Sequence, residues 1–292
     1  AAIRTPEPFL PAGTVIAREQ TYAHTFHKED APKQAFAGSE EDDRQVVFSG
    51  PHFKATFDKQ SGLLVSYRYK KQEYIHNGQG PRPFFWRAPT DNDYGAKLPV
   101  RLKAWKEASY QEPKAESFNV VRDKDTTAVK VTYRFPQTDA RWDITYKVYG
   151  NGVIKVDNHF VAENAQTPMI PRVGLRMRLP ARITSLTYYG RGPEENYRDR
   201  RTSQFIGEYT SGIQDMYEPY VRPQENNHRT DIYWCTLTSK AKEGLLFVAD
   251  RTFEMNVSNY PLESLDSGES IENGSPRTEK TNHRHLTDPQ PE

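Results

Sequence analysis

Apolar and polar residues alternate with a period of two along most of this chain, while helical periodicity is scarce. Because successive side chains of a β-strand point to opposite faces, the alternation predicts strands that each bury one face. Two such runs, 142–149 and 153–160, are separated by Gly150-Asn151-Gly152, whose residues tolerate the positive φ of a tight hairpin. Further strands are predicted at 46–48, 53–57, 63–69, 128–135, 173–179, 232–237 and 245–249. At least nine strands at hairpin spacing predict an all-β fold, a large antiparallel β-sandwich.

The segments outside this pattern suggest how the chain is divided. Residues 1–20 hold a proline-rich entry and one short predicted strand, 13–17, which is too little to bury a core. Residues 21–44 are charged, and we expect a linker there. The sandwich is then expected to occupy 45–292, with one short helix at 98–108 and no strand after residue 260.

Charge and cysteine content exclude several classes of protein. Forty basic residues stand against 39 acidic ones, whereas a nucleic-acid-binding protein would show a basic excess or stripe. No apolar run approaches the ~18–20 residues of a membrane helix. The first residues lack the layout of an export signal, so we expect a cytoplasmic protein, with the periplasm as the alternative. The single cysteine, Cys235, excludes an internal disulfide, and its apolar strand predicts an inert core thiol.

The densest polar run is FWRAPTDNDYG at 85–95. Asp91 and Asp93 could bind a calcium ion, but the other ligands of an EF-hand loop, including its distal glutamate, are missing. The run equally fits a rigid loop in which aspartate side chains cap backbone amides. The sequence favours this second, structural role.

A second polar run is YGRGPEENYRDR at 189–200. Its two glycines resemble the start of a phosphate loop, but the third glycine and the Lys-Ser/Thr ending are missing. Glu194 and Glu195 are adjacent, so on a strand they would point to opposite faces. The carboxyl groups of a retaining glycosidase instead lie ~5 Å apart across one substrate. We therefore expect the glutamates to pair with a nearby arginine, namely Arg191, Arg198 or Arg200.

A third polar run, PQENNHR at 223–229, precedes a predicted strand. His228 could carry a proton, because the unperturbed pKa of histidine is near neutrality, but a lone loop histidine is more often a hydrogen-bonding group. The three tryptophans Trp86, Trp142 and Trp234 are expected to pack in the core.

The three runs occur in the order found in one known family, and MYEPY at 216–220 stands before the third. Together they resemble the C-terminal small-chain domain of the β-galactosidases of glycoside hydrolase family 2. SGLL at 61–64 and HRHL at 283–286 match the same pattern, so the resemblance covers about residues 45–290. Residues 1–20 resemble the last strand of the immunoglobulin-like domain that precedes this domain in the family.

The resemblance implies a β-supersandwich of two antiparallel sheets, similar to the galactose mutarotases. It also implies that the two catalytic glutamates, and the magnesium and sodium sites, belong to an upstream (β/α)₈ barrel, so we expect no cofactor here. The segment near Gly95 resembles one that moves between open and closed positions beside the active site. A downstream aromatic residue of the family has no counterpart, so we expect a sandwich truncated at its C-terminus.

Thirteen residues are expected at the rim of the substrate pocket or at contacts between domains, and none is expected to be catalytic or to bind a metal. They are Arg87, Asp91, Asn92, Asp93, Gly95, Trp105, Arg191, Glu194, Glu195, Asn196, Glu225, Asn226 and His228. Trp105 is the expected exposed aromatic at the barrel contact. Asn227 stands where the family has glycine, and asparagine tolerates the same left-handed backbone.

Two hypotheses follow. In the first, the chain belongs to a β-galactosidase that hydrolyses terminal β-D-galactosides such as lactose with retention. The chain shapes the pocket beside a barrel domain, and the intact enzyme is expected to be a homo-oligomer. In the second, the chain is a stand-alone carbohydrate-binding or mutarotase-like module. That module would need a glutamate and a histidine, such as Glu225 and His228, converging on one sugar.

Overall fold

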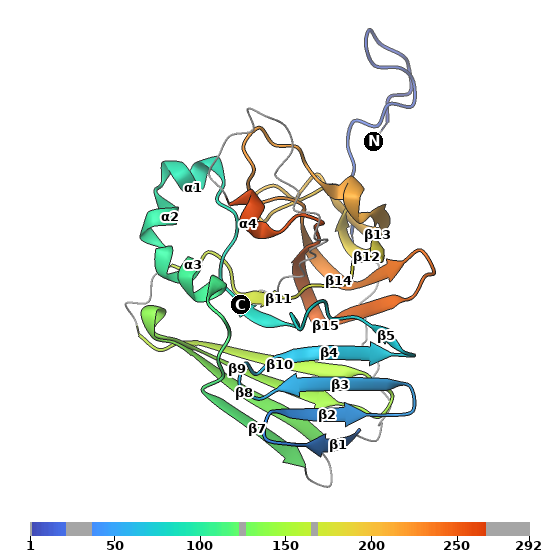
Figure 1. The fold of residues 1–292 in the computed structure, drawn as a ribbon. Helices are drawn as coiled ribbons and strands as arrows, with labels where there is room; N and C mark the ends of the chain where they lie inside the picture. The colour runs from blue at the N-terminus through green and yellow to red at the C-terminus, as the bar shows by residue number, and fades with distance from the viewer. Residues whose placement is uncertain (1, 22–36, 123–126, 165–168, 267–292) are drawn as a thin grey trace. The chain divides into compact units, whose positions relative to one another are not determined.

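A computed structural model describes residues 2–21, 37–122, 127–164 and 169–266 (Figure 1). The chain divides into two units, Ala1–Lys33 and Gln34–Glu292. Among the described residues of the first unit, only isolated bridges form, one of them between Ala2 and Val15. The predicted strand at 13–17 is therefore wrong. Its side chains are mostly exposed, so no burial stabilises an extended segment there.

The second unit contains the strands and helices. Its described strands are β1 (Gly38–Glu41), β2 (Gln45–Ser49), β3 (Phe53–Asp58), β4 (Leu64–Tyr69), β5 (Gln72–Glu73), β6 (Arg82–Phe84), β7 (Ser117–Arg122), β8 (Thr127–Phe135), β9 (Ala140–Val148), β10 (Ile154–Ala162), β11 (Gly174–Arg176), β12 (Ile183–Gly192), β13 (Phe205–Gly212), β14 (His228–Ser239) and β15 (Gly244–Asn256). The described α-helices are α1 (Asp91–Gly95), α2 (Leu98–Arg101), α3 (Lys103–Tyr110) and α4 (Leu262–Leu265), and short 3₁₀ turns lie at Pro136–Thr138 and Ile213–Met216.

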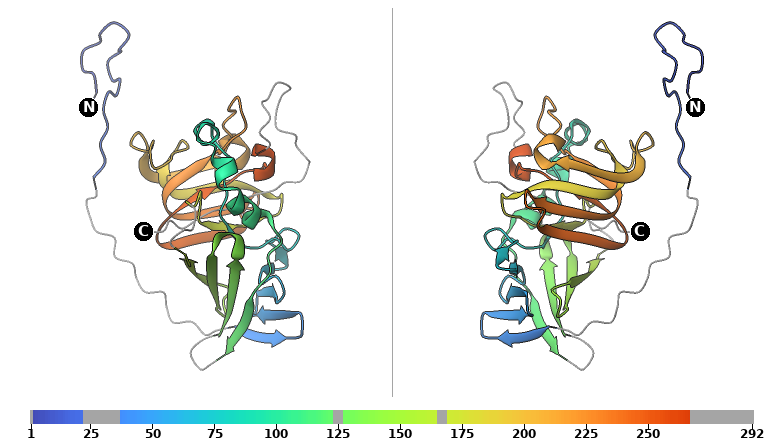
Figure 2. Two further views of the ribbon diagram at one scale, coloured as in Figure 1. Left: turned by 90° about the vertical axis from the view of Figure 1, so that its left-hand side faces the viewer. Right: turned by 90° about the vertical axis from the view of Figure 1, so that its right-hand side faces the viewer.

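The strands form antiparallel sheets, which confirms the predicted fold class. The strand orders are β1-β2-β3-β4-β5, β10-β9-β8-β7, β11-β6 and β13-β12-β14-β15 (Figure 1). The β9–β10 hairpin turns at the predicted glycines, where Gly152 has a φ of 93°. In Figure 2 the yellow to orange-red strands β12 to β15 form a layer of their own above the blue and green strands.

Aromatic side chains fill the space between the β1–β5 and β7–β10 sheets. The ring of Phe85 lies 4.9 Å from Trp105, 4.9 Å from Phe135 and 5.4 Å from Trp142, measured between ring centroids. Such tilted and edge-on pairs add to the free energy of burial. A second core, which contains Leu186, Tyr188, Cys235 and Leu237, packs against the inner face of the β12–β15 sheet. A chain with only 35% hydrophobic residues thus builds two cores from large rings and aliphatic strands.

The prediction that Trp105 is exposed is wrong, because its side chain is 0% exposed. The predicted helix at 98–108 divides at Leu102 into α2 and α3. Leu102, Trp105 and Ala108 lie at helical spacing, so α3 turns these three side chains into the first core. Trp86 and Trp142 are buried as predicted, whereas Trp234 is only half-buried.

The folded unit begins inside the segment 21–44 that we expected to be a linker. Strand β1 lies at Gly38–Glu41 and pairs with β2. Its charged side chains are largely exposed because β1 is an edge strand, and an exposed edge strand has the composition of a loop. Residues 22–36 of the expected linker, the expected C-terminal truncation of the sandwich and the HRHL motif at 283–286 lie outside the described residues.

We predict that Gly62→Ala lowers the free energy of unfolding by about 1–3 kcal/mol. Gly62 has a φ of +75°, and a Cβ there would lie 2.5 Å from the Tyr133 hydroxyl oxygen and 2.5 Å from a Val131 methyl carbon. Urea denaturation measures the change. The control is Gly38→Ala, whose Cβ would meet no atom within 4 Å, and its stability is expected to stay unchanged. Equal stabilities of the two variants would contradict the predicted clash.

Candidate functional site

The three polar runs singled out by the sequence converge in the structure. The Glu225 amide donates a hydrogen bond to the Ala88 carbonyl at 3.1 Å, which joins the first run to the third. The Asn227 amide donates to the Glu195 carboxylate at 2.7 Å, and the Asn196 amide donates to the His228 carbonyl at 2.9 Å. These bonds join the second run to the third, so most of the predicted residues lie in one connected region.

Helix α1 forms where we expected a tight loop, and Asp93 caps a backbone amide as predicted. Thr90 and Asp93 form a capping box, in which each side chain accepts a hydrogen bond from the other residue's backbone amide. Arg87 donates to Asp93 at 2.8 Å. Asn92 and Asp91 are exposed, and Gly95 ends the helix. Within the described part of the chain, no group of three or more His, Cys, Asp or Glu side chains could hold a metal ion.

Glu194 and Glu195 have different environments, as the sequence predicted. Glu194 is exposed, whereas Glu195 is 6% exposed and pairs with Arg200. Tyr220 also donates its hydroxyl proton to the Glu195 carboxylate. Burial and this bond raise the pKa of Tyr220 to about 12. The expected pairing with an arginine is therefore confirmed for Glu195, and the Tyr220 contact connects the second run to the segment before β14.

Arg191 lies outside this network, because Gly190-Arg191-Gly192 is the end of strand β12 rather than part of a loop. Its side chain donates to Asp231 at 2.6 Å and to the Gln204 carbonyl at 2.8 Å. Sequence reasoning missed β12 and its edge neighbour β13. Polar residues such as Ser185 and Thr187 make the apolar–polar alternation of these strands hard to detect in the sequence.

Asn196 is 0% exposed and uses both ends of its side-chain amide. Its NH₂ group donates to the carbonyls of Arg191 and Glu194, each at 3.0 Å. Its oxygen accepts from Thr230, at 3.0 Å from the amide and 2.6 Å from the hydroxyl. One side chain therefore holds the end of β12, the segment after it and the start of β14 in a single arrangement.

His228 lies between two acceptor oxygens at the start of β14. Its Nδ1 is 2.8 Å from the Asn256 side-chain oxygen, and its Nε2 is 2.8 Å from the Glu254 carboxylate. The Tyr197 ring stacks on the imidazole, with centroids 4.9 Å apart. Both ring nitrogens are thus occupied by protein groups, which confirms the reading of His228 as a hydrogen-bonding residue.

Glu225 and Asn226 complete the region. Glu225 pairs with Arg172 and accepts a hydrogen bond from Asn256 at 3.0 Å. Asn226 bonds to both backbone groups of Glu218, donating to its carbonyl at 2.6 Å and accepting from its amide at 3.1 Å. Glu225 and His228 therefore meet through Asn256, which bonds to each of them.

Glu254 and Asn256 were not predicted, although a signal was present. They are two residues apart on β15 and bond to His228 across the β14–β15 pair. Polar residues such as Glu254 and Asn256 at alternate positions of a predicted strand, here the one that begins with LLFVA, indicate a polar contact on one face of that strand. Burial opposes ionisation of Glu254, but hydrogen bonds and charges from His228 and Arg198 outweigh it and lower its pKa.

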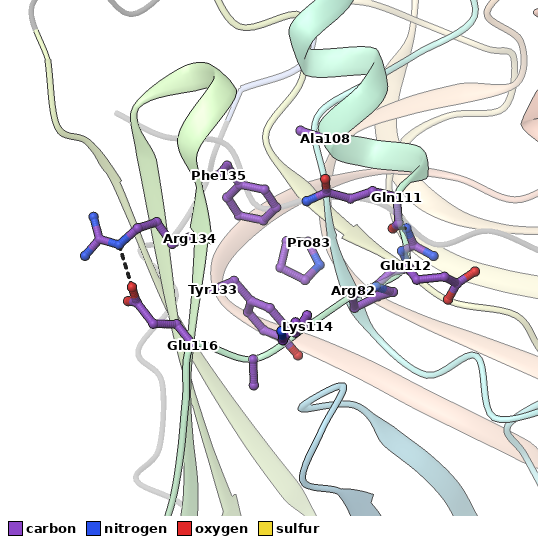
Figure 3. Close-up of a pocket in the computed structure, with 12 residues that line it drawn as sticks. Arg82, Pro83, Ala108, Gln111, Glu112, Lys114, Glu116, Tyr133, Arg134 and Phe135 are labelled. Carbon is purple, nitrogen blue, oxygen red and sulfur yellow. Dashed lines mark hydrogen bonds and ion pairs between the residues drawn. The ribbon is translucent and has the colours of Figure 1, made fainter.

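The larger hollows of this unit lie away from the predicted residues. One, of about 380 Å³, is bounded by Arg82 and Pro83 of β6 and by Tyr133 and Phe135 of β8 (Figure 3). An adjoining cleft of about 780 Å³ also includes Arg82. Two pockets that include predicted residues measure about 170 and 30 Å³, whereas small-molecule sites usually measure ~300–1,000 Å³. The predicted side chains thus bond to protein groups of the same region, such as Arg172, Arg200 and Glu254.

We predict that Asn196→Ala lowers the free energy of unfolding by about 2–4 kcal/mol, because Thr230 and two carbonyls lose their buried partners. Urea denaturation of the 292-residue chain checks this value. The control is Asn119→Ala on β7, where the asparagine is exposed, and there the change is expected to stay within ~0.5 kcal/mol. A similar small change at Asn196 would show that these bonds do not hold the region.

We predict that Glu254 makes the chain more sensitive to acid. The folded-state pKa of Glu254 is lowered from 4.5, so the carboxylate stabilises the fold above pH 4.5 and this contribution is lost as pH falls through the folded pKa. Glu254→Gln should therefore be less stable than the parent at pH 7, and its stability should fall less steeply below pH 4.5. Urea midpoints measured from pH 7 to pH 3 test this, with the exposed Glu243→Gln as control. Parallel curves for the parent and Glu254→Gln would contradict it.

In the described part of the chain, no helix is both long enough and apolar enough to span a bilayer.

Several β-galactosidases are similar in sequence to this chain. The β-galactosidase of Priestia megaterium is 32% identical over 85% of this chain and 24% of its own length. Those of Streptococcus thermophilus and Lactobacillus delbrueckii subsp. bulgaricus are 30% and 33% identical over 91% and 89% of this chain. They are covered over 26% and 25% of their own lengths.

The chain thus spans about a quarter of the length of these relatives. The family model described as β-galactosidase small chain matches residues 49–286. This match covers the three converging runs and the sheets that carry them, and the chain therefore belongs to the β-galactosidase small-chain family.

Proposed function

We propose that this chain is the C-terminal part of a β-galactosidase, in which it shapes the rim of the substrate pocket and contacts the catalytic domain. The intact enzyme hydrolyses terminal β-D-galactosides with retention, and the nucleophile and the acid/base belong to the part that this chain does not include. The magnesium and sodium ions of the first hypothesis are assigned to that same part. The relatives' identity as β-galactosidases supports the activity, and the arrangement of the buried carboxylates supports the division of roles.

The observation that carries this proposal is that each buried carboxylate of the converging region is already bound. Asp93 is bound by Arg87, Glu195 by Arg200, and Glu225 by Arg172. A catalytic carboxylate must instead reach the substrate, either as a nucleophile or as a proton donor. Groups held by arginines and backbone amides serve to position the segments that carry them.

The same geometry disfavours the stand-alone mutarotase-like module. That reaction needs a histidine and a glutamate that both point at one sugar. His228 is bound at both ring nitrogens, by Asn256 and Glu254, and Glu225 is bound by Arg172. Sugar binding at this pair would require breaking buried, charge-assisted bonds.

The mobile segment of the proposed rim is α1, and Arg222 supplies its outer contact. The Arg222 guanidinium is 3.3 Å from the Asp91 carboxylate and lies over the Tyr94 ring, 4.9 Å from its centroid. The ion pair is exposed, and exposed ion pairs contribute at most ~1 kcal/mol, which suits a segment that must open and close. This fits the resemblance of the Gly95 segment to a moving loop.

We predict that the 292-residue chain alone does not hydrolyse a chromogenic β-galactoside, whereas the polypeptide encoded by its whole gene does. The rate of release of the chromophore measures both. As a control for the preparation, a Glu225→Gln form of the chain should give the same background rate. Turnover by the chain alone that Glu225→Gln abolishes would contradict the proposal, because it would place a working carboxylate here.

A further inference from the structure

The outward face of the β12–β15 sheet carries no charge at its centre. Tyr189, Trp234 and Val248 form one cross-strand row, and Thr187, Thr236 and Leu246 form the next. We call these six residues the outer patch. Their neighbours along the strands, such as Tyr188 and Cys235, point inward and are buried. On β13 the two rows continue with Glu208 and Thr210, so the uncharged surface spans three of the four strands, β12, β14 and β15. In a chain with 27% charged residues, an uncharged outward surface of this width requires an explanation.

The β7–β10 sheet of the same unit provides an internal comparison. The corresponding rows there are Thr132–Asp143–His159 and Lys130–Thr145–Asp157. Ion pairs cross this surface, for example Lys147 to Asp157 at 3.6 Å. This is the usual composition of a sheet face that water covers. The outer patch therefore differs in composition from a solvated sheet face of the same protein.

The outer patch is exposed in this chain, and its side chains are large. Val248 is 66% exposed, Leu246 62% and Tyr189 39%. The Tyr189 ring lies 5.4 Å from Tyr233 and 6.5 Å from Trp234, so the aromatic side chains form a continuous ridge beside the two aliphatic ones. Contiguous exposed apolar groups of this kind mark sites where another protein surface binds.

The two threonine hydroxyl groups of the outer patch are already bonded within the sheet. Thr187 and Thr210 share a hydrogen bond of 2.8 Å, and the Thr236 hydroxyl donates to the Thr187 carbonyl at 3.5 Å. A saccharide would need free hydrogen-bonding groups beside the aromatic rings to bind its own hydroxyls. The threonine side of the patch therefore suits an apolar protein surface better than a sugar.

We infer that the outer patch packs against the remainder of the β-galactosidase polypeptide. This inference rests on the proposed role of the chain as part of a larger enzyme. The relatives carry about three-quarters of their length beyond the part that matches this chain, as a match of 24–26% implies. A partner in the same polypeptide has a high effective concentration and outcompetes a second copy of this chain for the same patch.

Thiol labelling tests this inference without reference to activity. The only cysteine of the chain, Cys235, is 0% exposed, so a cysteine placed on the surface is the reactive one. Leu246→Cys reports on the outer patch, and Val153→Cys reports on an exposed aliphatic position outside it, where Val153 is 55% exposed. Lys130→Cys adds a position on the charged face. Each is labelled with a maleimide in the 292-residue chain and in the whole-gene polypeptide, and peptide mass spectrometry measures each rate.

We expect Leu246→Cys to react at least tenfold more slowly in the whole polypeptide than in the chain, while Val153→Cys and Lys130→Cys keep their rates. Equal rates for Leu246→Cys in both proteins would overturn the inference, as would an equal slowing at all three positions. Slow labelling in the chain alone, together with a dimer in sedimentation, would assign the patch to a second copy and also overturn it. Because the readout is labelling, an inactive whole polypeptide would refute the proposed function and leave this result standing.

Discussion

A buried carboxylate needs a cation or an amide donor beside it, because burying an unpaired charge is costly. This constraint determines how the candidate site is built. Glu195, Glu225 and Glu254 come from three different segments of the chain, and each is buried. Each also bonds to another segment, Glu195 to Tyr220, Glu225 to Arg172 and Glu254 to His228, so burying one glutamate brings two stretches of chain together. Asn196 and Asn256 then satisfy the remaining backbone and side-chain groups between them. The region is rigid because separating any two of its segments would leave a buried charge without a partner.

The polar region at the start of β14 and the outward face of the β12–β15 sheet therefore have different roles. Near the start of β14, buried polar side chains bond to one another and to the backbone, which holds the ends of the second and third polar runs together. On the outward face, Tyr189, Leu246 and Val248 are exposed, and the Tyr189 ring contacts the rings of Tyr233 and Trp234. A rigid polar support beside an uncovered apolar surface is the arrangement expected of a domain that completes a larger protein.

Several features of the fold and the site could be predicted from local patterns. Examples are the β9–β10 hairpin, the capping role of Asp93 and the Glu195–Arg200 pair. Each depends on residues that are close in sequence, so local patterns are enough to predict it. Trp105 could not be placed in this way. Whether one face of a short helix meets a core or water depends on which sheet lies beneath it. The same holds for β1, whose charged residues describe an edge strand and a linker equally well.

The sequence by itself determined the class of fold, the hairpin turns and the three polar runs, because strand alternation and turn chemistry act over a few residues. Only the tertiary structure decided that the runs meet, and that His228 is enclosed by Glu254 and Asn256 rather than open to a ligand. It also decided which sheet face stays uncovered. These outcomes depend on contacts between residues far apart in the chain, and such contacts follow from the packing of whole sheets.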